Sequence, residues 1–319
     1  MITDNLTNLT GVDQNITYTV SPVETSGCVG SDFEVTVRVI SEPIAGDITE
    51  VPVCSNVPFS FDPQTNLLIA NGGNEVISDF TWIASYDVGI GGGSATGAGV
   101  VSETLTNQTN GQLNATYTIP PRSQVGNCLG GTFTLTVPID PEPVGTNSVK
   151  PDLICSGDAF PGSGINPQDN TSIPSTFTWT SSYETGLNVL SAGTGSGLIQ
   201  ETIENMTGGI LNAFYTITPT SLDGCLGTPF TITVRINPEP VGSPVTLAAV
   251  CSDVLFNINP QENINGSNSI SSTFSWVAAY DAGVTGGAGS GTGQISESLT
   301  NDSGGVLNAI YTIIPTAVG

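Results

Sequence analysis

Two acidic positions recur along this chain, and carboxylates can act as general acids and bases where histidine is absent. The sequence has no histidine, and Lys150 is its single lysine. Paired carboxylates could hydrolyse a glycosidic bond, but an active site seldom recurs in every copy of a repeat. We therefore predict structural roles for these acids, as turn formers or strand-edge charges, with no catalytic residue and no enzyme activity. The two sets are Asp87, Glu184 and Asp281, and Glu103, Glu201 and Glu297.

Metal-binding side chains are sparse. The cysteines stand far apart and histidine is absent, so the sequence argues against a zinc site and a Cys–His catalytic site. Calcium takes carboxylate oxygens, and acids recur near the joints between the repeats described below, although no dense Asp-x-Asp or EF-hand spacing occurs. Calcium is therefore the one metal for which we name candidate ligands, and no other cofactor is expected. The candidates are Glu42, Glu142, Glu239, Asp152, Asp158 and Asp253.

Three glycine-rich runs, at 89–99, 192–197 and 283–293, contain loose Gly-x-Gly-x-x-Gly spacings. A phosphate-binding loop needs a strand before the glycines and a helix after them. No helical pattern follows any of the runs, and no Gly-Lys-Ser/Thr occurs. We predict that they are loops that cross from one sheet to the other.

The chain is strongly acidic, with 28 acidic and 4 basic side chains among 319 residues and a formal net charge of −24. Four scattered cations cannot supply the basic surface that nucleic acid or anionic lipid requires. No apolar run approaches the ~18 residues of a membrane span. The sequence therefore predicts neither a nucleic-acid partner nor membrane insertion.

The elements that must position these residues belong to a tandem repeat. Trp82, Trp179 and Trp276 recur every 97 residues, each in a phrase such as "TFTWT". A tyrosine phrase recurs with nearly the same period, as "NITYTV", "NATYTI", "NAFYTI" and "NAIYTI". The period is about 97–100 residues, and the chain holds a little over three periods.

Each period contains six or seven short strands with period-2 alternation, which is typical of an immunoglobulin-like β-sandwich. In the run 230–236, for example, Phe230, Ile232 and Val234 face one way. Each tryptophan alternates with a phenylalanine on the same face, so we favour a core role over a sugar-stacking platform. The predicted core residues are Trp82, Trp179, Trp276, Tyr117, Tyr215 and Tyr311.

A Pro-rich phrase, "NPEPVG" at 237–242 and its counterparts at 41–46 and 140–145, closes each period. Proline restricts φ and makes a stiff spacer. We therefore predict an all-β, elongated array of sandwiches with joints near these phrases. The predicted domains are 1–41, the C-terminal part of a truncated repeat, 42–141 and 142–238, two complete repeats, and 239–319, a repeat truncated before its last strand.

The cysteines suggest disulfides within each sandwich. Each is followed five residues later by phenylalanine, and two strands that begin alike suit parallel neighbours tied at their starts. The first and last strands of an immunoglobulin-like module are such neighbours. We therefore favour Cys54–Cys128 and Cys155–Cys225, with Cys28 and Cys251 left without partners.

A second pairing scheme crosses each joint and leaves no cysteine unpaired. It needs a hairpin that turns at the Pro-Glu-Pro phrase. Either scheme should stabilise the fold by ~2–4 kcal/mol per bond and implies an oxidising compartment, hence an exported protein. The pairs in this scheme are Cys28–Cys54, Cys128–Cys155 and Cys225–Cys251.

The order "CSG…F", "TFTWT", "NATYTI" and "GCLG…FTITV…NPEP" resembles the PKD-like or immunoglobulin-like tandem repeats of giant Bacteroidota surface proteins. These include gliding-motility adhesins exported by the type IX secretion system. The "WDFGDG" core of the short PKD signature is absent, and "TWTSSY" stands in its place. The resemblance covers essentially the whole chain and implies a stalk or filament body at the cell surface.

Two functions remain open. The first is a non-catalytic shaft that holds a binding tip away from the cell. Its partners would be the neighbouring repeats, sister chains in a fibre, and a surface or glycan ligand bound at a tip elsewhere. The alternative is that the repeats are themselves glycan- or surface-binding modules of a secreted multidomain protein.

Overall fold

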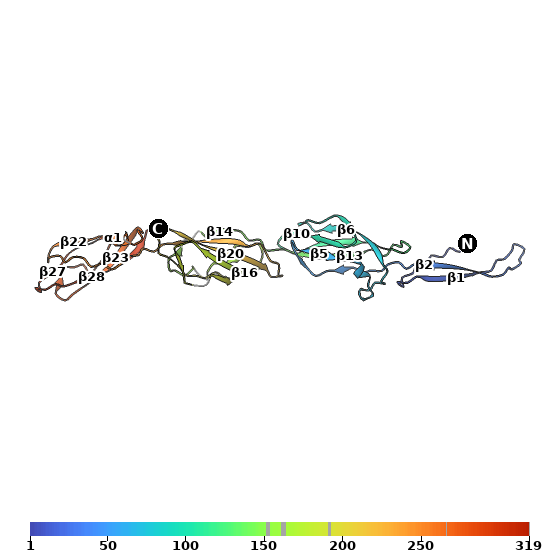
Figure 1. Ribbon diagram of the computed structural model, residues 1–319, viewed down its shortest axis with the longest axis horizontal. Helices are drawn as coiled ribbons and strands as arrows, with labels where there is room; N and C mark the ends of the chain where they lie inside the picture. Colours follow the sequence, from blue (N-terminus) through green and yellow to red (C-terminus); the bar gives the residue numbers. More distant parts are fainter. Residues whose placement is uncertain (151–153, 161–163, 191–192, 266, 319) are drawn as a thin grey trace. The chain divides into compact units, whose positions relative to one another are not determined.

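The computed structural model describes residues 1–150, 154–160, 164–190, 193–265 and 267–318, and Figure 1 shows each repeat as a separate set of strands. Regular structure in these residues is nearly all β-strand, as predicted, and none of their helices is long and apolar enough to cross a membrane. The chain forms two compact units, Met1–Pro143 with Thr220–Leu226, and Val144–Pro219 with Gly227–Gly319.

The larger sheet of the second repeat runs in the order β12–β6–β11–β13–β3, with β8 beside β6 and β4 beside β13. Neighbouring strands are antiparallel except that β3 and β4 pair in parallel with β13. The first and last strands are therefore parallel neighbours, as in an immunoglobulin-like sandwich. The elements in the larger sheet are β3 (Ile48–Thr49), β4 (Val53–Cys54), β6 (Ser78–Tyr86), β8 (Thr96–Ala98), β11 (Leu113–Ile119), β12 (Pro121–Ser123) and β13 (Phe133–Asp140).

A second layer covers this sheet, with β5 paired to β9 and β7 paired to β10. Alternate residues of β13 point inward, and Phe133 and Ile139 are each only 1% exposed. Phe61 and Val101 from the second layer join the same core, so two layers enclose one apolar interior. The remaining elements are β5 (Pro58–Phe61), η1 (Pro63–Leu67), η2 (Ile69–Asn71), β7 (Ile90–Gly91), β9 (Val101–Thr104) and β10 (Thr106–Asn107).

The third repeat has the same arrangement. Its larger sheet runs β14–β21–β20–β16–β18, with β15 also parallel to β21, and β17 pairs with β19. Trp179 and Tyr215 again lie in the core with alternate residues of β21. The elements are β14 (Ser148–Val149), β15 (Ile154–Cys155), η3 (Pro167–Asn170), β16 (Ser175–Tyr183), β17 (Leu187–Val189), β18 (Thr194–Ser196), β19 (Ile203–Asn205), β20 (Leu211–Ser221) and β21 (Phe230–Asn237).

The fourth repeat has β23 between β25 and β28, with β22 paired to β26 and β24 paired to β27. The first repeat contributes an antiparallel pair, β1 (Gln14–Val20) and β2 (Phe33–Val39). The fourth repeat's elements are β22 (Leu255–Ile258), α1 (Pro260–Asn265), β23 (Ser272–Tyr280), β24 (Val284–Thr285), β25 (Ser290–Thr292), β26 (Ile295–Ser298), β27 (Thr300–Asn301) and β28 (Ala309–Ala317).

The glycine-rich runs are more than loops, which corrects the prediction. Each contains a short strand that pairs antiparallel with the tryptophan strand and sets a glycine opposite the indole: Gly97 opposite Trp82 in the second repeat, with the same pairing in the third and fourth. A Cβ on Gly97 would lie 2.1 Å from the Trp82 ring. The glycine therefore leaves the space in which the ring lies.

Candidate functional site

The recurring acid of the second repeat is buried rather than set on a strand edge, which corrects the strand-edge prediction. Glu103 in β9 is 9% exposed. Its Oε2 accepts hydrogen bonds from the hydroxyls of Tyr86 (2.8 Å) and Tyr117, and its Oε1 accepts one from the Ser94 N–H at 2.7 Å. Because Tyr86 and Tyr117 belong to β6 and β11, the carboxylate connects the two layers of the sandwich.

The same acid–tyrosine cluster occurs in the next two repeats. Glu201 accepts from Tyr183 at 2.8 Å and from Tyr215 at 2.5 Å. Glu297 accepts from Tyr280 at 3.1 Å and from Tyr311. A buried charge is costly unless several donors surround it, and two hydroxyls provide that compensation here. Because the acid–tyrosine cluster recurs in each sandwich, a structural role that links the two layers is favoured over a catalytic role.

A sequence signal could have located this cluster. Glu103 stands between Val101 and Leu105 in the period-2 pattern, and both neighbours are 1% exposed or less. That alternation places the glutamate on the core face. A buried carboxylate needs donors, and the tyrosines recur with the same period as the acid.

Aromatic contacts bring the predicted core residues together around the cluster. The Trp82 and Tyr117 rings lie edge to face at 5.5 Å, and Trp179 and Tyr215 lie likewise at 5.8 Å. Each of the three tryptophans is 6–7% exposed. Such edge-to-face pairs contribute about 0.5–1.5 kcal/mol beyond their area burial. Tyr311 is half-buried and contacts Trp276 at 5.6 Å.

Stability should fall in alkali because of these tyrosines. Burial is the largest cause that raises the pKa of Tyr86 and of Tyr183, each to about 12, and it also raises the pKa of Tyr117 and Tyr215. The unfolded chain releases these protons near pH 10, where the folded chain keeps them. The tyrosine contribution is thus complete below pH 10 and is lost as pH rises toward 12.

Urea midpoints between pH 8 and 11.5, together with tyrosinate absorbance, test this expectation. The midpoint should hold to about pH 10 and then decline. Tyr86→Phe and Tyr183→Phe should each flatten the decline, because each removes a proton that only the unfolded chain releases. A midpoint that stays level to pH 11.5 in the unmodified chain would refute the expectation.

The other recurring acids, Asp87, Glu184 and Asp281, lie at turns, as predicted. Asp87 follows β6 and accepts from the Asn114 N–H at 2.8 Å. Glu184 accepts from the Asn212 side chain at 2.9 Å and from its N–H at 2.8 Å, and these bonds lower the pKa of Glu184. Asp281 accepts from the Asn308 N–H at 2.8 Å. These side-chain bonds reach the start of the tyrosine strand, whereas the turn after the tryptophan strand is closed by each acid's carbonyl, which accepts from the N–H three residues later at 3.0–3.2 Å.

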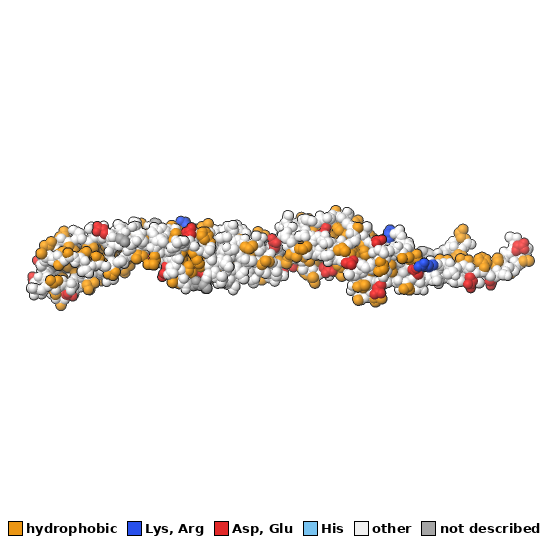
Figure 2. Space-filling view, in the orientation of Figure 1, with side chains coloured by type: hydrophobic (Ala, Val, Ile, Leu, Met, Phe, Trp, Pro, Cys, Tyr) orange, Lys and Arg blue, Asp and Glu red, His pale blue; other side chains and the backbone are white. Residues whose placement is uncertain are grey.

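The calcium candidates are not gathered into a cluster. Among the described residues, no group of three or more His, Cys, Asp or Glu side chains could hold a metal ion, and acids are scattered over the face shown in Figure 2. Glu142 accepts from the Asn56 side chain at 3.1 Å, and Glu42 is half-buried. Glu239, Asp158 and Asp253 are exposed, and Asp152 lies outside the described residues.

Each complete repeat has two distinct ends, which we call leading and trailing. The leading end is where the last strand begins and where the chain arrives from the preceding repeat. The trailing end is where the last strand finishes. In the second repeat Ile48 pairs with Leu135 near the leading end, and Cys54 pairs with Asp140 at the trailing end. Cys128 precedes Phe133 and so lies at the leading end.

The favoured pairing is therefore wrong. Phe133 to Asp140 spans about 23 Å at ~3.3 Å per residue, whereas a disulfide needs Cα atoms within about 7 Å. Cys54 thus cannot reach Cys128, and the same register separates Cys155, beside Asn237, from Cys225. The structure instead bonds Cys54 to Cys225, with their Cα atoms 5.5 Å apart.

The second scheme is also wrong, because two of its pairs need Cys54 or Cys225, which bond each other. Its third pair needs Cys128 and Cys155, and neither is bonded. The thiols of Cys28, Cys128, Cys155 and Cys251 are free. The recurring Cys-x4-Phe spacing misled the prediction, because Phe59 lies in β5 of the second layer whereas Phe133 begins β13.

Comparison with known proteins gives distant structural likenesses and one family match. No curated protein matches the chain. The FN1-FN3 domains of chicken CNTN1 share 10% identity, with 85% of this chain and 93% of that chain covered and a TM-score of 0.22. A mutant of the enterotoxigenic E. coli CFA/I adhesin CfaE shares 8% identity, with 73% and 81% covered and a TM-score of 0.18. At these TM-scores neither likeness decides fold or function.

The sequence family gives a clear result. The PKD-like domain matches four successive stretches, residues 1–43, 51–143, 152–240 and 248–319. The stretches together cover most of the chain, and they carry the sandwiches and acid–tyrosine clusters described above. The chain therefore belongs to the family of PKD-like domains.

Proposed function

We propose that the chain is the non-catalytic, repetitive shaft of an exported cell-surface adhesin or filament, which holds a binding tip away from the cell. Tandem PKD-like domains support this proposal. So does the resemblance of the repeats to those of Bacteroidota surface proteins exported by the type IX system. In such arrays each module folds around its own core and contacts its neighbours. The observation that carries the proposal is the set of hydrogen bonds and close contacts that joins consecutive repeats.

The joint between the first and second repeats is held by one asparagine. The Asn74 side chain of the second repeat donates to the carbonyls of Leu9 (3.2 Å) and Glu42 (2.8 Å), and its Oδ1 accepts from the Ile44 N–H at 3.0 Å. The turn of the first repeat packs against it, since a Cβ on Gly11 would lie 2.3 Å from the Asn74 carbonyl oxygen. Through this one side chain, the second repeat binds the end of the first repeat and the linker between them.

The joint between the third and fourth repeats is built in the same way. Asn268 donates to the carbonyls of Thr207 (3.4 Å) and Glu239 (2.7 Å) and accepts from the Val241 N–H at 3.2 Å. A Cβ on Gly208 would lie 2.9 Å from the Asn268 carbonyl oxygen. Hydrogen bonds between consecutive repeats, added to Pro-rich linkers, restrict bending, which is the property a spacer needs.

Small-angle scattering tests the spacer role. A compact 319-residue globule should have a radius of gyration near ~20 Å. A row of sandwiches, each ~30 Å long, should have a radius of gyration above ~30 Å. We expect the larger value. Asn74→Ala with Asn268→Ala should broaden the distance distribution and increase proteolysis at 39–46 and 237–242. Asn71→Ala, whose side chain bonds the Thr65 carbonyl inside its own repeat, is the matched control.

A radius near ~20 Å would refute the shaft, and no effect of the asparagine pair would refute the stiff joint. Measurement with and without chelator separates the calcium hypothesis, because a large radius that falls on chelation would assign joint stiffness to calcium. Glycan-array binding by a two-repeat fragment would favour the alternative of binding modules. That alternative cannot use the three tryptophan rings as sugar platforms, since each is 6–7% exposed.

A further inference from the structure

The described disulfide joins one repeat to the next. Cys54 belongs to the trailing end of the second repeat, and Cys225 lies in the loop at the leading end of the third. Both residues belong to the first compact unit. That unit includes Thr220–Leu226, although the rest of the third repeat belongs to the second unit. The bond is therefore a joint, and the question is whether the free cysteines belong to joints of the same kind.

Cys155 has the same surroundings as Cys54. Each is followed by a serine whose N–H donates to the last strand, Ser55 to Asp140 O at 2.8 Å and Ser156 to Asn237 O at 2.9 Å. Each serine Oγ then accepts from the N–H of a buried asparagine, Asn107 at 3.0 Å or Asn205 at 2.8 Å. Cys155 is exposed, so its thiol is presented at the trailing end of the third repeat.

Cys128 likewise has the surroundings of Cys225. The Cys225 N–H donates to Ser221 Oγ at 3.0 Å, and the Cys128 N–H donates to Ser123 Oγ at 2.8 Å. In return each serine N–H donates to the cysteine carbonyl, at 2.8 Å in the third repeat and 2.9 Å in the second. The two loops differ in length by one residue, but both hold the cysteine backbone to the serine by the same pair of hydrogen bonds.

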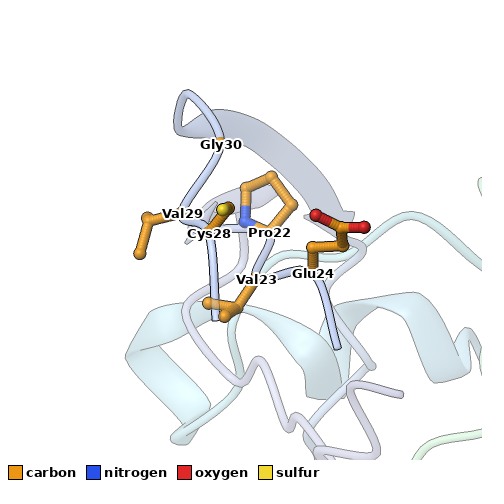
Figure 3. Close-up of a pocket in the computed structure, with 6 residues that line it drawn as sticks. All are labelled: Pro22, Val23, Glu24, Cys28, Val29 and Gly30. Atoms are coloured by element: carbon orange, nitrogen blue, oxygen red, sulfur yellow. The ribbon is translucent and has the colours of Figure 1, made fainter. Parts of the chain in front are cut away.

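The first repeat carries the same loop around Cys28. Val23 and Val29 form an isolated bridge across it, as Thr220 and Leu226 do around Cys225. Figure 3 shows the two arms of the loop around a hollow lined by Pro22, Val23, Glu24, Cys28, Val29 and Gly30. Cys28 is exposed and Cys128 is partly exposed, so the first two repeats each carry a free cysteine at the leading end, where the third carries the bonded Cys225.

We infer that Cys155 and Cys128 are halves of further inter-repeat disulfides. Cys155 bonds the leading-end cysteine of the repeat that follows it, and Cys128 bonds the trailing-end cysteine of the repeat that precedes it. The partner is in each case another copy of this repeat. Neither partner cysteine occurs in the sequence. No cysteine precedes Cys28, and none follows Cys251. The inference does not rest on the shaft role, because binding modules could be joined in the same way.

Bond formation is an ordinary thiol–disulfide exchange. Two cysteine thiols give up two protons and two electrons to a small-molecule disulfide such as oxidised glutathione, which leaves as two thiols. An oxidising compartment supplies such an oxidant. Cys28 and Cys251 occupy the corresponding leading and trailing ends, so the same rule covers all four free cysteines.

Duplication of the third repeat within the full chain tests the inference. A copy of residues 144–240 inserted after Pro240 keeps a natural linker sequence at each junction. The copied Cys225 then lies at the leading end of the repeat that follows the original Cys155. The chain then has eight cysteines. After refolding with oxidised and reduced glutathione we expect two disulfides and four free thiols by maleimide labelling. Six free thiols, with Cys54–Cys225 intact, would overturn the inference.

Matched serine variants identify the partner. Cys155→Ser in the original repeat should abolish the new bond and leave one disulfide, whereas the same change in the inserted copy should leave both bonds. The opposite result would show pairing inside one repeat and would also overturn the inference. Retention of Cys54–Cys225, mapped by non-reducing peptide mass spectrometry, shows that each variant has folded.

A second chain guards against misfolding of the duplicated protein. Residues 224–240 appended after Gly319 complete the fourth repeat with a cysteine loop and a last strand. The added cysteine should bond Cys155 and reduce the free thiols from four to three. An added cysteine that stays free, or that bonds Cys251 within its own repeat, would contradict the inference.

Discussion

Replacing Glu103 with alanine is expected to lower the free energy of unfolding of the second repeat by about 3–5 kcal/mol. The Tyr117 hydroxyl and the Ser94 N–H lose their acceptor, whereas the Tyr86 hydroxyl keeps the Ser94 carbonyl at 2.8 Å. A buried donor left without a partner costs about 1–3 kcal/mol. The small alanine side chain also leaves a void beside residues of the core.

The unfolding of this one repeat can be followed through its tryptophan. In a background of Trp179→Phe and Trp276→Phe, Trp82 alone reports, and its ring contacts Tyr117 at 5.5 Å within the same cluster. Urea titration should show an earlier midpoint for Glu103→Ala. Ser102→Ala, at the exposed neighbouring position of β9, should change stability by less than about 0.5 kcal/mol. Equal urea midpoints for Glu103→Ala and Ser102→Ala would show that the carboxylate does not stabilise the contact between the two layers.

Replacing Gly97 with alanine is the second large expected effect, a loss of about 2–3 kcal/mol from overpacking. The new Cβ would lie 2.1 Å from Cζ2 and 2.4 Å from Cε2 of Trp82. The ring cannot move aside, because it is 6% exposed and packed against Tyr117. A methyl group at this point must therefore displace either the ring or the strand that carries the glycine.

Gly131→Ala is the matched control, because a Cβ there meets nothing within 4 Å and its backbone is not left-handed. It should leave the thermal midpoint nearly unchanged by circular dichroism. Trp82→Phe removes the part of the indole that Gly97 faces, so it should recover part of the loss caused by Gly97→Ala. Simple additivity of the two changes would contradict a direct clash, since contacting residues are expected to couple.

Much of the fold could be predicted because its signals are local. Trp82 alternates with Phe80 along one strand, and both are buried at 6% and 8% exposure. Side chains of a strand alternate between its two faces, so the buried face can be read without knowledge of the partner strand. The recurrence of this pattern every 97 residues also predicts the tandem sandwiches.

The candidate site could be predicted only in part. The turn role of Asp87 follows from its place after a strand, which is local information. The role of Glu103 depends on two hydroxyls, from Tyr86 and Tyr117, that lie 17 and 14 residues away in sequence. A carboxylate on the inner face of a strand is stable only when such donors converge on it, and convergence is a property of the packed layers.

The cysteines show most clearly where local information ends. Local patterns in the sequence were enough to predict the class of fold, the period and the core face of the tryptophan strands. Tertiary structure alone decided which cysteines meet, because the parallel register puts Cys54 beside Asp140 and Cys155 beside Asn237 at the trailing ends. Strand register is set by pairing between distant segments. A bond between repeats therefore emerges only when complete sandwiches follow one another.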